Sequence, residues 1–181
     1  MQEKTQEQAS WCVICTSHCR EQRVADYLTR CGLSSFIPMK WAEKYNPKNE
    51  KIERVLEPAI HNLLFIKKIY AEQELYAIRE KSPTPFNILH NPLTGKIQEI
   101  PEKRMVEFRA ICDPSYTGTL YVEAEIAETR IGTPVRVIRG TFTGLEGKLT
   151  RYKGRHYVIV TLATMGVMIH IPKWYCQPTQ K

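Results

Sequence analysis

A glycine-rich turn between two short apolar segments is the feature of this sequence that most restricts the fold. The stretch 132–149 reads GTPVRVIRGTFTGLEGKL. Its glycines Gly140, Gly144 and Gly147 can adopt backbone angles that are closed to other residues, so the chain can reverse within a few residues. Phe142 presents an aromatic ring at the turn. The stretch therefore predicts two paired strands joined by a tight connection.

The residues after position 131 are typical of a small β-barrel. Val, Ile, Thr and Gly dominate there, and turn residues separate the apolar runs at close spacing. This pattern predicts four short strands, at 135–139, 147–152, 157–161 and 167–171. In the first of them, alternation directs Val135 and Val137 inward and Arg136 outward. The sequence thus predicts an SH3-like β-barrel over residues 131–181.

The positive charge of the chain is concentrated in this predicted barrel. The whole chain has a net charge of +7, and residues 131–181 hold eight Lys or Arg residues against one acid, Glu146. Residues 1–130 carry equal numbers of basic and acidic groups. A concentrated positive field favours an anionic partner, either nucleic acid or an acidic protein surface. The alternative is a solvated basic surface without a fixed partner, since charge alone sets no specificity.

The first part of the chain alternates between strand and helix patterns. The apolar periodicity predicts strands at 11–15, 35–41, 52–56 and 63–69, and helices at 20–31, 72–81 and 101–112. Residues 43–51 are polar and predict a loop or hairpin tip, and residues 91–95 predict a turn. Together these elements predict an α+β fold in which helices flank an antiparallel sheet.

The same patterns divide the chain into four stretches. We expect a disordered tail at 1–9, a first domain at 10–112, a linker at 113–130 and the barrel at 131–181. Within the linker, residues 120–127 are apolar at alternate positions and can add a strand. The N-terminus lacks the apolar segment of a secretory signal, and no apolar run reaches the roughly 18 residues of a membrane helix. We therefore expect a cytoplasmic protein.

No arrangement of residues typical of an enzyme stands out, and we predict no catalytic residue, cofactor or metal. Cysteines are frequent, however, at positions Cys12, Cys15, Cys19, Cys31, Cys112 and Cys176. Cytosolic thiols stay reduced, so disulfides are not expected. One alternative is a redox pair of Cys12 and Cys15, although the Val-Ile between them favours a strand with the thiols on opposite faces. Another is zinc held by Cys12, Cys15, His18 and Cys19.

The glycine-rich stretch closely resembles the KOW motif of NusG-type elongation factors and of certain ribosomal proteins. The residues that match this motif are Arg136, Arg139, Gly140, Phe142, Gly144 and Gly147. Upstream, residues 11–14 look like the opening strand of the NusG N-terminal domain, and residues 21–28 resemble its first helix. The resemblance covers about residues 10–178 and implies a transcription elongation or antitermination factor rather than an enzyme.

One stretch departs from the general family pattern. Residues 57–66 resemble the family segment that ends Pro-Gly-Tyr-Leu-Phe-Val, but His61, Asn62 and Leu63 replace its Pro, Gly and Tyr. This version is similar to the UpxY family, specialised NusG paralogues of Bacteroides that switch on capsular polysaccharide operons. The resemblance implies a factor that promotes read-through of such an operon. A general NusG-type elongation factor is the alternative.

The resemblance also implies binding surfaces. The family docks an apolar groove onto the β′ clamp helices of RNA polymerase, and the matching side chains are Leu63, Phe65, Phe86 and Leu89. Ordinary core packing is the alternative for these four. Specialised members contact the non-template DNA strand, with nascent RNA as an alternative ligand, and the candidate residues are His18, Arg20, Arg23 and Lys81. The barrel would bind nucleic acid, a ribosomal protein or a termination factor, and we expect a monomer.

Overall fold

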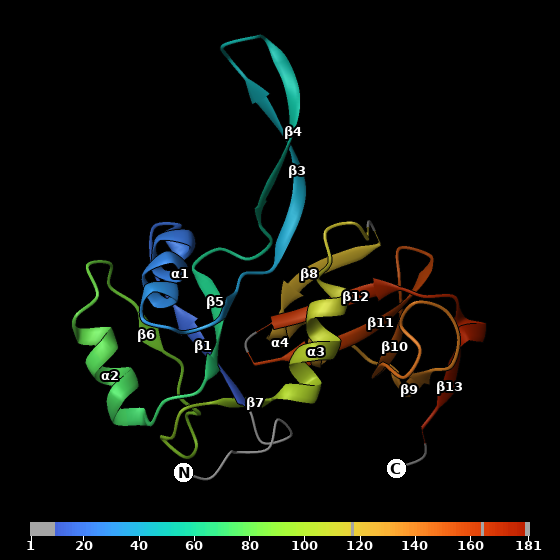
Figure 1. The fold of residues 1–181 in the computed structure, drawn as a ribbon. Helices are drawn as coiled ribbons and strands as arrows, with labels where there is room; N and C mark the ends of the chain where they lie inside the picture. Colours follow the sequence, from blue (N-terminus) through green and yellow to red (C-terminus); the bar gives the residue numbers. More distant parts are fainter. Residues whose placement is uncertain (1–9, 117, 164, 180–181) are drawn as a thin grey trace. The chain divides into compact units, whose positions relative to one another are not determined.

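The computed structural model describes residues 10–116, 118–163 and 165–179 and shows a mixed α+β fold (Figure 1). The chain divides into two compact units, the first ending at Met105 and the second beginning at Val106. The predicted tail, 1–9, and Lys181 of the predicted barrel lie outside the described residues. Among the helices of the described ranges, none is long and apolar enough to cross a membrane.

The first unit is organised around a five-stranded antiparallel sheet. Its strands are β1 (Ser10–Cys15), β2 (Ser35–Phe36), β5 (Leu63–Lys68), β6 (Asn87–Ile88) and β7 (Glu99–Pro101). The order is β2-β5-β1-β6, and β7 also pairs with β1. Strands β1 and β5 form the central pair, in which Val13 lies opposite Phe65 and Cys15 opposite Leu63. This register decides which face of the sheet each later site residue occupies, because strand side chains alternate.

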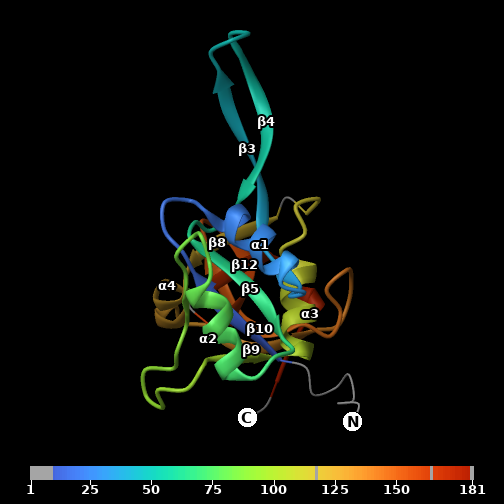
Figure 2. The same cartoon turned by 60° about the vertical axis from the view of Figure 1, so that its left-hand side comes forward.

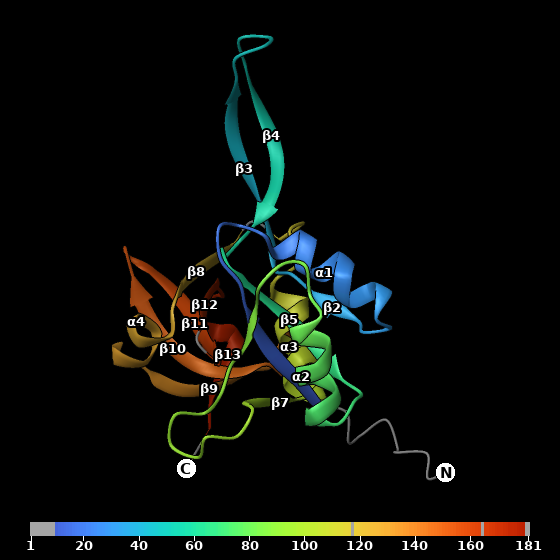
Figure 3. The ribbon, with the colours of Figure 1, turned by 90° about the vertical axis from the view of Figure 1, so that its left-hand side faces the viewer.

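Helices α1 (Glu21–Arg30) and α2 (Glu72–Glu80) lie beside this sheet (Figure 3). One apolar cluster joins them to it and includes Cys12, Ile14, Val24, Leu28, Leu64, Ile66 and Leu75. The β1 and β5 members of the cluster are alternate residues, as expected for one face of a strand pair. Each fully buried Leu or Ile contributes about 1.5–3 kcal/mol. The cluster thus fixes the two helices on one face of the sheet.

A long hairpin projects from the first unit (Figure 2). It consists of β3 (Met39–Asn46) and β4 (Lys51–Pro58), which pair only with each other among the described strands. The polar tip was predicted, but the predicted strand at 35–41 is divided into β2 and β3. Pro38 lies at the division, and a proline has no N–H group to continue a ladder of hydrogen bonds.

The second unit contains a six-stranded antiparallel sheet with the order β13-β9-β10-β11-β12-β8. Its strands are β8 (Thr119–Glu123), β9 (Thr133–Val137), β10 (Glu146–Tyr152), β11 (Arg155–Leu162), β12 (Met165–His170) and β13 (Cys176–Pro178). A 3₁₀ turn, η2 (Lys173–Tyr175), precedes β13. The four predicted strands are present with shifted ends, whereas β13 was not predicted. This sheet-rich region is consistent with the predicted barrel.

The described residues of the stretch predicted as a linker, 113–130, include regular elements and do not form a free connector. It contains β8 and the helix α4 (Ala124–Thr129). Strand β8 pairs with β12, placing Val122 opposite Gly166, and Ala127 of α4 is fully buried. The strand expected at 120–127 is thus present only in its first part, because β8 ends at Glu123 and residues 124–127 belong to α4. The division at Met105 also falls inside α3 (Glu102–Ile111), before the expected domain end at 112.

Candidate functional site

Three of the four predicted groove residues share one face of the first sheet. Leu63 and Phe65 lie on the face of β5 opposite to the α1–α2 cluster, because Leu64 and Ile66 belong to that cluster. Leu89 joins them, since its N–H donates to the carbonyl oxygen of Val13 at 2.9 Å and Val13 pairs with Phe65. We call this the Phe65 face, and its members are Trp11, Val13, Phe36, Leu63, Phe65 and Leu89.

The fourth predicted residue, Phe86, packs on the other side of the sheet. It belongs to the α1–α2 cluster together with Ile88, which lies opposite Ile14. On the Phe65 face, Phe65 is 0% exposed and Leu63 is 7% exposed. The ring centroids of Phe65 and Phe36 are 6.3 Å apart, with the planes tilted by 35°. The four residues therefore do not line one open groove in this structure, and their role in binding stays a prediction.

Three of the predicted nucleic-acid contacts lie at the start of α1, and the fourth, Lys81, follows the end of α2. His18, Arg23 and Lys81 are exposed, and Arg20 is half-buried. The hydroxyl of Thr16 donates to the carbonyl oxygen of Pro85 at 3.1 Å, so the loop after β1 touches the loop after α2. This contact brings the segment with His18 and Arg20 close to the segment that begins at Lys81. The surface is basic and accessible, as a contact to phosphates requires.

Asn62 links the start of β5 to the loop after β1. Its backbone has the left-handed φ of 63°, which Asn tolerates better than most residues with a side chain. Its side-chain Oδ1 accepts the N–H of Cys19 at 2.9 Å, and its carbonyl oxygen accepts the N–H of Thr16 at 2.9 Å. Its own N–H donates to Oε1 of Glu21. Asn62 thus holds a left-handed backbone where the resembled pattern has Gly, and it adds a side-chain hydrogen bond.

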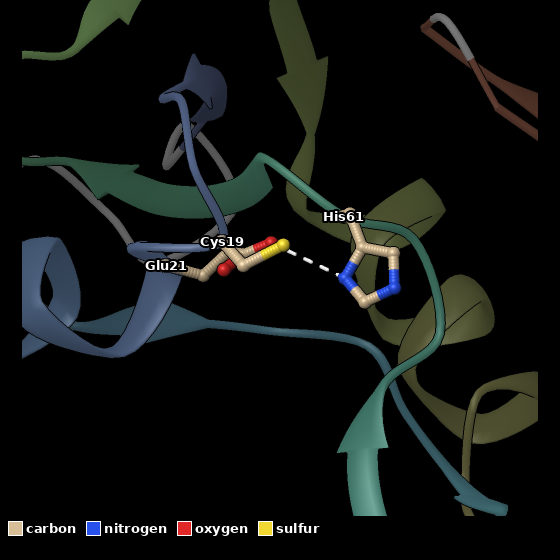
Figure 4. A group of neighbouring side chains, drawn as sticks. All are labelled: Cys19, Glu21 and His61. Atoms are coloured by element: carbon tan, nitrogen blue, oxygen red, sulfur yellow. Dashed lines mark ion pairs between the residues drawn. The ribbon is translucent and has the colours of Figure 1, made fainter.

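A group of three possible metal ligands lies around this link and was not predicted from the sequence. Figure 4 shows Cys19, Glu21 and His61, whose ligand atoms all lie within 4.8 Å of one another. Glu21 is buried, whereas Cys19 and His61 are exposed. His61 is 40 residues from Glu21 in the sequence. No local spacing could have indicated the group, because only the pairing of β1 with β5 brings the two segments together.

The two alternatives based on the early cysteines are not supported by the geometry. Cys12 and Cys15 lie three residues apart on β1 and so project to opposite faces. Burial raises the pKa of the Cys12 thiol to about 12 and also raises the pKa of Cys15. A redox pair or a zinc site needs thiolates, and these two thiols resist ionisation. All six cysteines lie among the described residues and are free thiols.

The glycine-rich turn of the second unit connects β9 to β10 as predicted. Val135 and Val137 are buried, and Arg136 is exposed and forms an ion pair with Glu146. Phe142 is half-buried, with its ring edge-on to Tyr116 at a centroid distance of 4.8 Å. The turn is therefore anchored by an aromatic contact within its own unit.

Gly140 and Gly144 have φ values of 85° and 93°, which explains the glycines at these two positions. Gly147 is needed for another reason, because a Cβ atom there would collide with the backbone of Ile159. These glycines are thus required for the turn and for the close approach of the strands. Arg139, next to Gly140, is exposed.

The basic residues of the second unit differ in how freely they can reach a ligand. Lys148 is held by a hydrogen bond from Nζ to the carbonyl oxygen of Glu128 at 2.9 Å. Arg151, Lys153 and Arg155 are exposed around the β10–β11 turn, and Nζ of Lys153 lies 5.4 Å from the ring centre of Tyr152. This turn offers three positive charges to an anionic partner.

The hairpin carries an exposed apolar face that the sequence reasoning also missed. Trp41 lies opposite Leu56 and Tyr45 opposite Ile52, so the four side chains share one face of the ribbon. Tyr45 is 62% exposed and Ile52 is 70% exposed. The guanidinium carbon of Arg54 lies 5.1 Å from the ring centre of Trp41. The signal was present in the sequence as alternation across residues 41–45 and 52–56.

Comparisons with known proteins agree with this architecture. Residues 9–109 match the family model described as NusG, transcription termination factor nusG. The chain is also similar to a solved structure of Thermotoga maritima NusG, with a TM-score of 0.50 and 14% sequence identity. That alignment covers 96% of this chain and 98% of the other, and the likeness concerns the fold alone. No curated protein shows a significant sequence match.

Proposed function

Since this chain belongs to the NusG family, we propose that it is a non-enzymatic transcription elongation and antitermination factor that binds RNA polymerase in the cytoplasm. The observation that carries the proposal is the family match over residues 9–109, which spans the first sheet and its helices. The second unit supports it, because its sheet contains the strand–turn–strand element with the glycine pattern of a KOW motif. The factor acts as a monomer.

The Phe65 face is the polymerase contact in this proposal. Leu63, Phe65 and Leu89 have apolar side chains of the kind that an amphipathic helix, such as a clamp helix, binds. Leu63 and Phe65 are buried in this structure, so a partner reaches them only after the side chains that cover them move. Phe86 contributes indirectly, by packing β6 against the α1–α2 cluster.

Two neighbouring substitutions test this contact. Leu63→Ala and Leu64→Ala each truncate a buried leucine of β5, and each should lower the free energy of unfolding by about 2–4 kcal/mol. Only Leu63 lies on the Phe65 face, whereas Leu64 lies in the α1–α2 cluster. We expect the intact protein and Leu64→Ala to bind purified core RNA polymerase, and Leu63→Ala to bind at least about tenfold more weakly.

The measurement is the dissociation constant for core polymerase, corrected for the folded fraction of each variant. Failure of the intact protein to bind would overturn the proposed function. Equal loss of binding in both variants would overturn only the assignment of the Phe65 face. The comparison is informative because the two leucines are adjacent, chemically identical and buried to a similar extent.

Two further contacts complete the proposal. His18, Arg20, Arg23 and Lys81 contact the phosphates of the non-template DNA strand or of nascent RNA, and the exposure of His18, Arg23 and Lys81 supports this. The second unit, with Arg136, Arg139 and the turn glycines, binds nucleic acid, a ribosomal protein or a termination factor. Crosslinking of an assembled elongation complex, followed by mapping of the linked residues, identifies which partner each surface reaches.

The factor is a specialised, UpxY-like antiterminator that acts on a capsular polysaccharide operon. The sequence His61-Asn62-Leu63 supports this, because it departs from the general family pattern and is structurally accommodated by the left-handed Asn62. The alternative is a general elongation factor. Polymerase occupancy along the genome, with and without the protein, separates the two. Changes in polymerase occupancy at one or a few operons support a specialised antiterminator, and changes across most genes contradict it.

A further inference from the structure

A second, independent site lies in the first unit, and we propose that Cys19, Glu21 and His61 bind a divalent transition-metal ion of the zinc class. The three residues come from the loop after β1, the first turn of α1 and the turn before β5 (Figure 4). Their ligand atoms lie within 4.8 Å of one another, and Nδ1 of His61 is 3.9 Å from Oε1 of Glu21. The site does not depend on the proposed role in transcription.

The buried carboxylate is the strongest argument for a cation. Glu21 is 1% exposed, and burying a carboxylate is costly unless a positive group compensates it. The N–H of Asn62 donates to Oε1 and supplies a dipole but no full charge. His61 is 53% exposed in its side chain and supplies a charge only when it is protonated. A bound cation would compensate the carboxylate permanently and leave His61 neutral as a ligand.

The ligand types select the metal. A thiolate with an imidazole suits zinc and related ions, whereas magnesium and calcium prefer oxygen ligands alone. In a tetrahedral zinc site the bonds of about 2.0–2.3 Å place ligand atoms roughly 3.5 Å apart. The observed spacing needs only a small closing movement of exposed side chains. Three protein ligands leave one position for water, and binding releases the Cys19 thiol proton to solvent.

The backbone around the site is held in place without a metal. Cys19 has a left-handed φ of 53°, and its N–H is bonded to Oδ1 of Asn62. Asn62 in turn bonds Glu21 through its own N–H and is the neighbour of His61. All three ligands therefore sit on segments that Asn62 connects. Metal binding would clamp the loop after β1 to the residue that leads into β5.

The test uses the full chain, freed of metal with a chelator and kept reduced. Cobalt(II) is titrated as a spectroscopic probe, because a cobalt–thiolate bond gives a charge-transfer absorption band, and zinc is then added to compete. We expect one equivalent of cobalt to bind with this band and zinc to displace it. Cys19→Ser should remove the band. Cys19→Ser and His61→Ala should each weaken zinc binding by at least about 100-fold, since even loss of a ligand's hydrogen-bond partner costs about 10- to 100-fold.

Matched controls keep other thiols and imidazoles from being mistaken for the site. Cys31→Ser and His18→Asn change the same residue types in the same unit and should leave the band and the affinity unchanged. Both ligand substitutions are at exposed positions, so the variants should fold as the parent does. Absence of the band in the parent protein overturns the proposal. Survival of the band in Cys19→Ser, or its loss in Cys31→Ser, overturns it equally.

Discussion

At the scale of single residues, Asn62 shows how a departure from a family pattern can be absorbed. The position requires a left-handed backbone, which glycine adopts at no cost and Asn adopts at a small cost. The side chain offsets part of that cost, because its Oδ1 accepts a hydrogen bond from the N–H of Cys19. The same residue therefore positions the loop that carries His18, Cys19 and Arg20.

Substitution of Asn62 separates these two contributions. Asn62→Ala should lower the free energy of unfolding by about 2 kcal/mol, because it keeps the strained backbone and loses the hydrogen bond. Asn62→Gly should lower the free energy of unfolding by only about 1 kcal/mol, because it also loses the hydrogen bond but removes the backbone strain. Urea denaturation of the two variants and the parent measures both values. If Gly were as costly as Ala, the left-handed conformation would not be the reason for Asn.

The buried thiol of Cys12 makes stability depend on alkaline pH. Its pKa is raised by burial to about 12, whereas in an unfolded chain this thiol has a pKa of about 8.5. Below about pH 8.5 the folded and the unfolded state both hold the Cys12 proton, so this thiol adds no pH dependence to the free energy of unfolding. Above it only the unfolded state loses the proton, so the free energy of unfolding falls as the pH rises.

Cys12→Ala should therefore flatten the pH dependence between about pH 9 and pH 10. The expected change in slope is up to about 1.4 kcal/mol per pH unit for one thiol. The variant will be less stable at neutral pH because it leaves a small cavity, so the slope and not the absolute value is compared. Urea unfolding at a series of pH values measures the slope of the free energy of unfolding against pH. An unchanged slope would show that Cys12 is accessible to ionisation in the folded protein.

At the scale of elements, the β9–β10 connection depends on two kinds of glycine. Gly144 has a φ of 93° and no atom within 4 Å of the position of a Cβ, so its requirement is conformational. Gly147 lies in β10, where a Cβ would collide with the carbonyl oxygen of Ile159 on β11, so its requirement is steric. The first glycine shapes the turn and the second lets neighbouring strands approach.

The two glycines should respond differently to the same substitution. Gly144→Ala should cost about 1–2 kcal/mol of unfolding free energy from backbone strain alone. Gly147→Ala should cost about 3 kcal/mol or more, since backbone atoms of β11 must move to make room. Thermal or urea unfolding of both variants compares them. A larger cost at Gly144 than at Gly147 would contradict the close approach of β10 and β11.

At the scale of the whole molecule, charge and apolar surface are distributed between the two units. The positive excess of the chain lies in residues 131–181, and three exposed basic residues gather at the β10–β11 turn. The first unit contributes the exposed apolar face of the hairpin, and its Phe65 face is apolar but buried. An elongation factor with a protein contact on one unit and a polyanion contact on the other would have this distribution.

Salt dependence tests the division of charge. The logarithm of the association constant for a DNA duplex falls linearly with the logarithm of the salt concentration. Replacing Arg151, Lys153 and Arg155 by Gln should make this negative slope shallower by about 0.9 per lost phosphate contact. Replacing the exposed Lys48, Lys51 and Lys96 of the first unit by Gln removes the same charge and should leave the slope unchanged. Fluorescence anisotropy at several salt concentrations measures both. Equal effects of the two triple variants would contradict a specific basic surface on the second unit.

The sequence by itself determined most of the longer elements and the class of protein. Apolar periodicity located β1, α1, β5 and α2, because local side-chain patterns reflect which face of an element is buried. Glycine spacing located the β9–β10 turn, because the backbone angles of a tight turn depend on the residues within it. The resemblance to the NusG family, carried by these same segments, agrees with the family match over residues 9–109.

Only the tertiary structure decided which distant residues meet. The antiparallel pairing of β1 with β5 brought His61 to Cys19 and Glu21, and it placed Leu63 and Phe65 on one face while Phe86 went to the other. The pairing of β8 with β12 turned an expected linker into part of a sheet. Such contacts depend on which strands pair across tens of residues, and the alternation of side chains within one strand does not specify its partner strand.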